Sequence, residues 1–378
     1  MRRLWLSLHL WTGLSVGVLL VALGLSGSLL VWRDSLDRLG NPARYAVTAG
    51  NPALPPSVYL ANAAAALGNG FAPQTIRYPE GDGSPVVVQA RNAGNAAQAM
   101  RVYMDPPTGR VLDTADFRSS LLGTLVGFHE NLRIPEYNGR SIVGWTGVAM
   151  LISALTGIWL WWPRHGAFRR GLRWRRGPGT ASNLHHRLGI FIAVPLAVVS
   201  VTGIYIAFPQ QGRQLLGSVA AMTPPGPRPG FAQPLARPAL GVDRVLDMAL
   251  KAELGARPAM IALPSRQAPI WRIQLEGPDA AELITVTVDD ASTTLTKLPT
   301  LPGDQIAQWV RWLHEGSHAG LGWRLAVFCS GVFPAVFFVT GLMIWWHRRR
   351  PRAVIAPAAR APTMDGREGT ILAGPNKL

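Results

Sequence analysis

Charged residues are scarce in this sequence, and cysteine is almost absent. Only 15% of the 378 residues are charged, while 48% are hydrophobic. This balance excludes an ordinary soluble protein and indicates an integral membrane protein. The single cysteine, Cys329, excludes an intramolecular disulfide.

Motifs of soluble enzymes are missing as well. The sequence has no Gly-x-Ser-x-Gly, no His-Glu-x-x-His and no phosphate-binding loop. No Gly-x-Gly-x-x-Gly follows a strand pattern, so we expect no flavin or nicotinamide site in this chain. We therefore predict no catalytic side chain, and any redox chemistry would need another group.

Four segments are long and apolar enough to cross a bilayer, which takes about 20 largely apolar residues. They are residues 6–31, 141–162, 188–208 and 325–346. The first is too long, and too poor in small residues at a cleavage position, for a removable signal peptide. We expect it to be a retained membrane anchor.

The basic residues predict the orientation of these segments. Sixteen of the 37 lysines and arginines lie before the first segment, in the loop at 163–187 or in the tail at 348–378, with only Asp365 and Glu368 among them, a net charge of +14. The two long loops have a net charge of +2. Positive charge marks the cytoplasmic side. We expect both termini to be cytoplasmic and both long loops to be periplasmic, in a bacterial inner membrane. Anionic lipid explains the basic excess better than nucleic acid does.

Four of the eight histidines lie in a duplicated pattern. His9 is followed by Gly13 and Ser26-Gly27, and His185 is followed at the same spacings by Gly189 and Thr202-Gly203. His129-Glu130 and His314-Glu315 each precede an apolar stretch ending in Thr-Gly-x-x-x-Trp-Trp, at 156–162 and 340–346. Duplication of this kind predicts two copies of one structural unit. It places two histidine pairs at two depths of a membrane, a layout suited to binding haem.

The duplication divides the chain into two tandem repeats. The first, residues 1–162, contains the span 6–31, a periplasmic domain at 33–118, a re-entry helix at 119–132 and the span 141–162. The second, residues 184–347, contains the span 188–208, a periplasmic domain at 209–302, a re-entry helix at 303–318 and the span 325–346. We expect each periplasmic domain to pack one helix, 58–67 or 242–254, on a small antiparallel sheet. The strands are expected at 86–91, 100–104, 270–275 and 283–288. The predicted fold class is membrane α+β.

The sequence resembles the PepSY-associated transmembrane family, which includes inner-membrane proteins that reduce ferric siderophores. The residues that carry the resemblance are those of the His9 and His185 motifs, the Ser/Thr-Gly pairs and the two Thr-Gly-x-x-x-Trp-Trp endings. It covers nearly the whole chain. It implies two PepSY-like periplasmic domains and a four-helix core with two b-type haems that pass electrons outward.

Each haem would need two axial ligands from facing helices, and a closed six-coordinate site favours electron transfer. The repeat pairs His9 with His185 at the cytoplasmic side and His129 with His314 at the outer side. No Cys-x-x-Cys-His sequence is present, so we expect the haems to be held without covalent attachment.

The second repeat leaves two alternatives open. His186 competes with its neighbour His185, because adjacent helical residues point about 100° apart and only one should face the core. His318 competes with His314, since residues four apart share a helical face. The other two histidines, His165 and His347, are expected to be solvated or interfacial.

The predicted function is that of a haem-dependent ferric-siderophore reductase. Electrons would come from another molecule, a cytoplasmic reductase or a quinol. The ferric chelate would dock between the two periplasmic domains. Residues near the outer histidines are candidates for shaping this dock: Arg133, Tyr137, Trp309, Arg311 and Trp312.

Two other functions fit parts of the sequence. A sensor or interaction protein would use the periplasmic domains alone and leave the histidines incidental. A haem or metal transporter is the other alternative, although no acidic residue within the four spans suggests an ion-coupled path.

Overall fold

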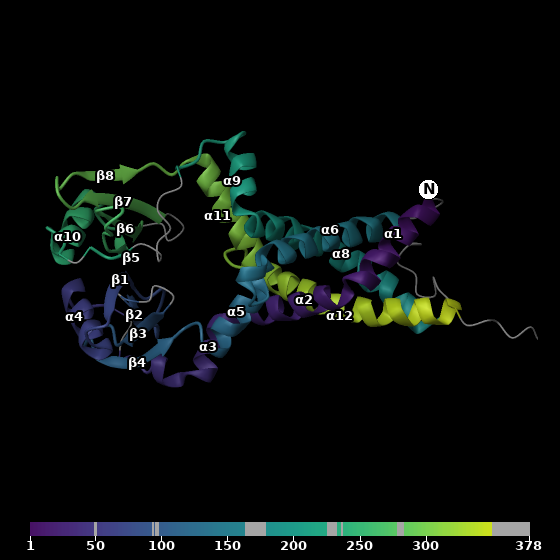
Figure 1. The fold of residues 1–378 in the computed structure, drawn as a ribbon, viewed down its shortest axis with the longest axis horizontal. Coiled ribbons are helices and arrows are strands. Elements are labelled where there is room, and N and C mark those ends of the chain that lie inside the picture. The colour runs from purple at the N-terminus through teal and green to yellow at the C-terminus, as the bar shows by residue number, and fades with distance from the viewer. Residues whose placement is uncertain are drawn as a thin grey trace, which may run out of the picture.

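The computed structural model describes residues 1–48, 51–92, 94, 98–162, 179–224, 233–235, 237–277 and 283–349. Long helices form a bundle at one end of the molecule, and a β-sheet lies at the other (Figure 1). Short helices join the two parts: α3 (Arg33–Gly40), α5 (Leu121–Asn131), α9 (Pro209–Gly217) and α11 (Pro302–Glu315).

Three helices of the bundle are each long and apolar enough to cross a membrane, namely α6 (Gly139–Trp161), α8 (Thr180–Ala207) and α12 (Gly320–Arg349). A fourth span is formed if α1 (Arg2–Ser15) and α2 (Gly17–Val31) are taken together. These two helices meet at a bend of 67°. Three of the four predicted spans are therefore continuous helices, and the segment 6–31 is broken.

The break has a local cause and a packing cause. The Ser15 hydroxyl donates to the Trp11 carbonyl at 2.6 Å, a bond that competes with the helical ladder and bends helices. Gly17 follows, and the ring of Phe338 on α12 occupies the place where its Cβ would be. Ser and Gly together are a common site of sharp kinks.

Glycine also brings α2 close to α12. A Cβ on Gly24 would collide with the carbonyl oxygen of Gly331, and a Cβ on Gly331 would collide with that of Gly24. Small residues let helix backbones approach in this way, and that contact replaces the hydrophobic drive that lipid does not provide. The α8 helix packs between α6 and α12 in the bundle.

The strands form one antiparallel sheet of eight, in the order β4-β3-β2-β1-β5-β6-β7-β8. The first four come from the first long loop: β1 (Phe71–Arg77), β2 (Val86–Asn92), β3 (Ala99–Met104) and β4 (Val111–Asp116). The others come from the second: β5 (Arg257–Ala262), β6 (Ile270–Glu276), β7 (Leu283–Asp289) and β8 (Leu295–Leu298). The predicted runs at 86–91, 100–104, 270–275 and 283–288 lie within β2, β3, β6 and β7.

The strands of the two long loops are joined in one sheet, whereas two separate sheets were predicted. Strand β1 pairs with β5, with Ile76 opposite Ile261 at the centre of three paired positions. Both isoleucines are fully buried. The two expected sheets are therefore one, and the edge at which the predicted dock would open is closed by backbone hydrogen bonds.

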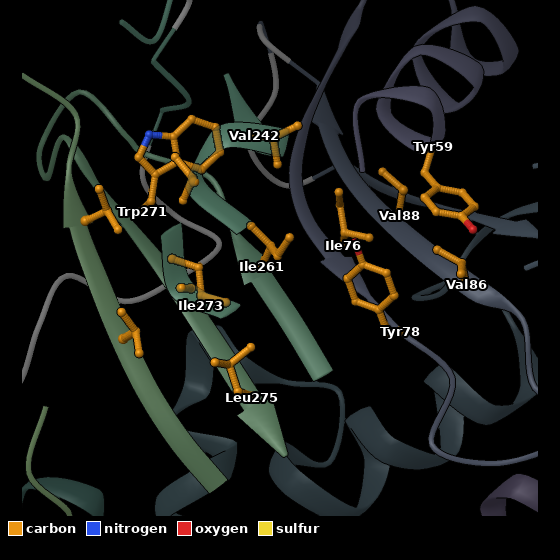
Figure 2. Close-up of a cluster of buried hydrophobic side chains, with 14 of the residues drawn as sticks. Tyr59, Ile76, Tyr78, Val86, Val88, Val242, Ile261, Trp271, Ile273 and Leu275 are labelled. Carbon is orange, nitrogen blue, oxygen red and sulfur yellow. The ribbon is translucent and has the colours of Figure 1, made fainter. Parts of the chain in front are cut away.

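One hydrophobic core underlies the joined sheet. Helices α4 (Pro56–Leu67) and α10 (Val242–Ala252) cover the face of the sheet that points away from the bundle (Figure 1). Figure 2 shows the buried side chains running across the junction, from Tyr59 and Val88 through Ile76 and Ile261 to Trp271. The two helices also meet directly, because the Ser57 hydroxyl and amide donate to the carboxylate of Asp243.

A buried aspartate follows β3 and another follows β7. Asp105 accepts hydrogen bonds from the amide and hydroxyl of Thr48 and from the hydroxyl of Thr108. Burial alone raises the pKa of Asp105, but these hydrogen bonds outweigh it and hold the pKa below its usual range. Asp290 accepts from the amides of Ala239 and Leu240 and from the Trp271 indole. Each carboxylate fixes the chain that leads into α4 or α10.

We expect Asp290→Ala to lower the free energy of unfolding by about 3 kcal/mol, because it leaves two amides and an indole N–H without their acceptor. Near-UV circular dichroism during thermal unfolding of the purified protein would measure the loss. Asp247→Ala is the control, since its exposed pair with Lys251 contributes no more than about 0.5 kcal/mol. Equal stability of the two variants would contradict the role given to Asp290.

Candidate functional site

Four histidines from different helices form two facing pairs within the bundle. His9 on α1 faces His185 on α8, with ring centres 6.2 Å apart. His129 on α5 faces His314 on α11, with ring centres 6.3 Å apart. The structure thus brings together the pairs that the repeat predicted, which we call the inner pair and the outer pair.

Each of the four rings is held through Nδ1 by a neighbouring helix. His9 Nδ1 lies 2.9 Å from the Thr156 hydroxyl and 3.1 Å from the Ser153 carbonyl. His185 Nδ1 lies 2.9 Å from the Thr340 hydroxyl. In the outer pair, His129 meets the Ser26 hydroxyl and the Leu23 carbonyl, and His314 meets the Thr202 hydroxyl and the Val199 carbonyl, all at 3.1–3.2 Å.

The glycine after each hydroxyl residue makes room for the ring. A Cβ built on Gly27 would lie 2.8 Å from Cε1 of His129, and one on Gly203 would lie 2.9 Å from Cε1 of His314. The corresponding distances are 3.4 Å from Gly157 to His9 and 3.7 Å from Gly341 to His185. Each of the four Ser/Thr-Gly pairs in the sequence therefore contacts one histidine ring: the hydroxyl meets Nδ1, and the glycine makes room for the ring. Their equal spacing in the sequence is a signal for this contact as well as for the repeat.

These contacts determine which nitrogen of each ring carries the proton. A carbonyl oxygen can only accept, so Nδ1 is the donor in His9, His129 and His314. The Thr340 hydroxyl donates to the Val336 carbonyl, and its oxygen is left to accept from His185 Nδ1. The lone pair then lies on Nε2, which has no hydrogen-bond partner among the described residues in any of the four rings. A neutral imidazole with a free Nε2 is a metal ligand.

The two pairs lie at different depths. On α8, His185 belongs to the inner pair, and Val199, whose carbonyl holds His314, lies beside the outer pair. Val199 lies 14 positions after His185, which corresponds to about 21 Å at the rise of an α-helix. Among the described residues, no group of three or more His, Cys, Asp or Glu side chains is placed to hold a metal ion. Within the part of the chain that the structure describes, each pair is thus a set of two imidazoles without a third His, Cys, Asp or Glu placed to join them on one metal ion.

A cavity of about 630 Å³ surrounds the outer pair. Its walls come from α2, α6, α8 and α12, and both His129 and His314 line it. Charged residues also line it: Arg33, Asp34, Glu130, Arg140, Arg311, Glu315 and Arg324. Two of these arginines hold helix ends, since Arg140 donates to the carbonyls of Ile206 and Ala207 and Arg324 donates to that of Val31. The carboxylate of Glu315 forms ion pairs with Arg33 and Arg311, with nitrogen–oxygen distances of 3.4 and 3.5 Å.

The two alternative histidines occupy other positions. His186 lies beside His185, its ring centre 6.4 Å away, and it is His185 that faces His9. The prediction that His318 shares a helical face with His314 is wrong, because α11 ends at Glu315 and Gly316 adopts a left-handed cap. His318 instead stacks on Trp312, with ring centres 4.2 Å apart, and lines the cavity.

The remaining predicted residues lie around the outer end. The rings of Trp309 and Trp312 lie edge to face, with their centres 5.2 Å apart, and Tyr137 is exposed. Arg133 contacts residues of the first half of the chain, where its guanidinium donates to the Arg118 carbonyl and the Thr124 hydroxyl. His347 is exposed, as expected, with Nδ1 at 2.7 Å from the Met343 carbonyl. His165 and most of the arginine-rich loop lie outside the described residues.

A protein-family model, described as the PepSY-associated TM region, matches residues 6–348 of the chain. The chain belongs to this family. No curated protein matches it. Membership agrees with the three long apolar helices, so this PepSY-associated chain is a membrane protein, and its four paired histidines lie in the part that the match covers.

We expect Gly203→Ala to destabilise the protein by about 1–3 kcal/mol, because the new methyl group would press on the His314 ring. Thermal unfolding in one detergent would compare it with Gly322→Ala on α12, where a Cβ meets no atom within 4 Å. The control should be neutral or slightly stabilised by the helix propensity of alanine. If both variants behave alike, the ring of His314 does not rest on Gly203.

Proposed function

We propose that this protein holds two b-type haems, one in each histidine pair, and reduces ferric siderophores at the periplasmic face of a bacterial inner membrane. The observation that carries the proposal is the repeated arrangement of two opposed imidazoles, each with Nδ1 held by a Ser/Thr-Gly pair and with Nε2 free. It occurs twice, at two depths of the bundle.

The spacing of the rings suits a metal ion between them. Two imidazole–metal bonds of about 2 Å, with each nitrogen about 1 Å from its ring centre, put the ring centres about 6 Å apart. The observed separations are 6.2 and 6.3 Å. Two protein ligands leave four positions of a six-coordinate iron, which a macrocycle supplies. This fits haem better than a bare metal ion.

A cavity at the outer pair and two open glycines near the inner pair support the binding of a macrocycle. The 630 Å³ cavity contains the outer pair. Beside the inner pair, Gly13 and Gly189 each come four residues after a histidine, on the same helical face. A Cβ on either glycine would meet no atom within 4 Å.

The hydrogen bonds to Nδ1 would tune such a group. Ligating histidines usually donate the other N–H to an acceptor, which sets the ring orientation and raises the basicity of the ligand. Here the Ser, Thr and carbonyl oxygens act in that way. Two imidazole ligands for each haem would favour electron transfer over oxygen binding. When bound, haem supplies one-electron redox chemistry, and the protein supplies its position and its surroundings.

We propose four spans arranged as two tandem repeats, with the termini in the cytoplasm and the sheet in the periplasm. The N-terminus and the end of α12 lie at the end of the bundle opposite the sheet (Figure 1). The segments with a net charge of +14 begin at that end. This is the distribution that the positive-inside rule requires. The inner pair is then the cytoplasmic one, nearest to the electron donor.

The electron donor must be a second molecule, a cytoplasmic reductase or a quinol, because the chain has no flavin or nicotinamide motif. The substrate is a ferric siderophore. One electron converts its Fe(III) to Fe(II), which hard oxygen donors bind more weakly, so the metal is released. Since β1 and β5 are paired, we propose that the chelate docks between the sheet and the outer end of the bundle.

The purified protein should contain about two haems per chain and should show an α-band that sharpens with dithionite. Alanine at His9 or His185 should remove one haem, and alanine at His129 or His314 should remove the other, because each change deletes one axial ligand. Pyridine haemochrome analysis would give the stoichiometry. His347→Ala, an exposed position, should keep both. A colourless protein from haem-replete cells would refute the proposal.

Loss of one hydroxyl should weaken one site selectively. Thr340→Val removes the oxygen that meets His185 Nδ1 while keeping the size of the side chain. We expect haem affinity at the inner site to fall about 10–100-fold. Transfer of haem to apomyoglobin would measure the release, with the outer haem as internal standard. Equal release from both sites, at the wild-type rate, would show that the hydroxyl does not act on the ligand.

A further inference from the structure

The sheet has one covered face and one that points toward the bundle. Helices α4 and α10 lie on the far side (Figure 1). Side chains alternate along a strand, so the residues between the buried core positions belong to the bundle-facing side. On β6, Trp271, Ile273 and Leu275 are in the core, which leaves Arg272 and Gln274 on the other face. On β2, Val86 and Val88 are in the core, which leaves Gln89 and Arg91.

The strand register assembles these side chains into continuous rows across the junction. Thr75 and Ala262 pair directly between β1 and β5, and the row continues to both sides. From β3 to β7 it reads Arg101, Gln89, Thr75, Ala262, Arg272 and Thr287. The next row, from β2 to β7, reads Val87, Arg77, Met260, Gln274 and Thr285. The two rows contain three arginines, two glutamines and no acidic residue.

The positive charge of these arginines is largely uncompensated. Within the described residues, neither Arg101 nor Arg272 has a carboxylate partner, and the Arg101 guanidinium lies 3.7 Å from the centre of the Phe117 ring. Among the described residues, Asp113 on this face pairs with Arg44, which also pairs with Asp37, and Glu276 pairs with Arg257. Arg77 has only a solvent-exposed pair with Glu80.

A further cation lies in the same region. Arg91 on β2 is 8% exposed, and its Nε donates to the neutral side chain of Gln74. Burial lowers the pKa of Arg91, and the positive charge of Arg118 lowers it further. Arg91 is thus largely buried, and its guanidinium is close enough to Arg118 for their charges to interact. Although the two long loops together have a net charge of only +2, this face concentrates positive charge.

We propose that this arginine face, defined by Arg77, Arg101 and Arg272 with Gln89 and Gln274, binds negatively charged ferric chelates. Guanidinium and amide N–H groups match the carboxylate, hydroxamate or catecholate oxygens of such a chelate. The face looks toward the end of the bundle where the outer pair lies (Figure 1). The inference rests on the proposed reductase function and adds a substrate class to it: anionic chelates are preferred over cationic ones.

Binding can be tested without electron transfer by using gallium(III) citrate, an anionic chelate whose metal resists reduction. Isothermal titration with the full-length protein in nanodiscs of zwitterionic lipid should show binding that weakens as salt screens the charges. The gallium complex of desferrioxamine B, which is cationic, should bind at least tenfold more weakly. The variants Arg101→Gln and Arg272→Gln should each weaken citrate-complex binding about tenfold. Arg244→Gln, on α10 behind the sheet, is the matched control and should leave it unchanged.

Three results would overturn the inference. They are equal affinity for the anionic and cationic complexes, affinity independent of salt, or no effect of either variant while Arg244→Gln behaves like wild type. Binding that is lost only when anionic lipid is added would show that the face contacts the membrane instead. Haem content separates this inference from the proposed function. If the protein contains two haems but reduces both kinds of chelate equally, the preference for anionic chelates is wrong and the proposed function stands. If the protein contains no haem but binds gallium citrate, the reductase function is wrong and the binding face stands.

Discussion

The hydrogen bond from each histidine Nδ1 to a Ser or Thr on another helix is the contact on which the bundle depends. It recurs four times with the same chemistry: a hydroxyl accepts from Nδ1, and the glycine that follows lets the ring lie against the backbone. A buried imidazole without a partner would be costly in this apolar setting, and so would a buried hydroxyl. Each hydroxyl donates to a backbone carbonyl of its own helix and meets Nδ1 of the histidine, so that only Nε2 is left without a partner among the described residues.

These hydrogen bonds and the histidine pairs connect the chain in different ways. His9 bonds to α6 and His129 to α2, both within the first half of the chain, while His185 bonds to α12 and His314 to α8, within the second. The facing pairs, in contrast, each take one ring from either half. A group bound between two rings would therefore bridge the halves. The contact between β1 and β5 bridges them again at the other end of the molecule.

Much of this arrangement could be read from spacing, and the failures have identifiable causes. The pairing of His9 with His185 and of His129 with His314 follows from the duplication. Strands β1 and β5 escaped notice because Pro73 and Pro258 interrupt their apolar pattern. Their pairing joins Ile76 to Ile261, a contact between residues too far apart in the chain for local patterns to indicate. The error over His318 was avoidable, since Gly316 is the usual residue for ending a helix.

The bend at Val16 makes the two histidine pairs mechanically unequal. Helix α2, beside the outer pair, has seven buried residues, whereas α1, which carries His9, has none. The hydrogen bonds of the His9 ring to Ser153 and Thr156 are thus a main attachment of α1 to the bundle. The inner pair therefore depends on a helix that contributes no buried residue, whereas the outer pair lies beside the well-packed α2.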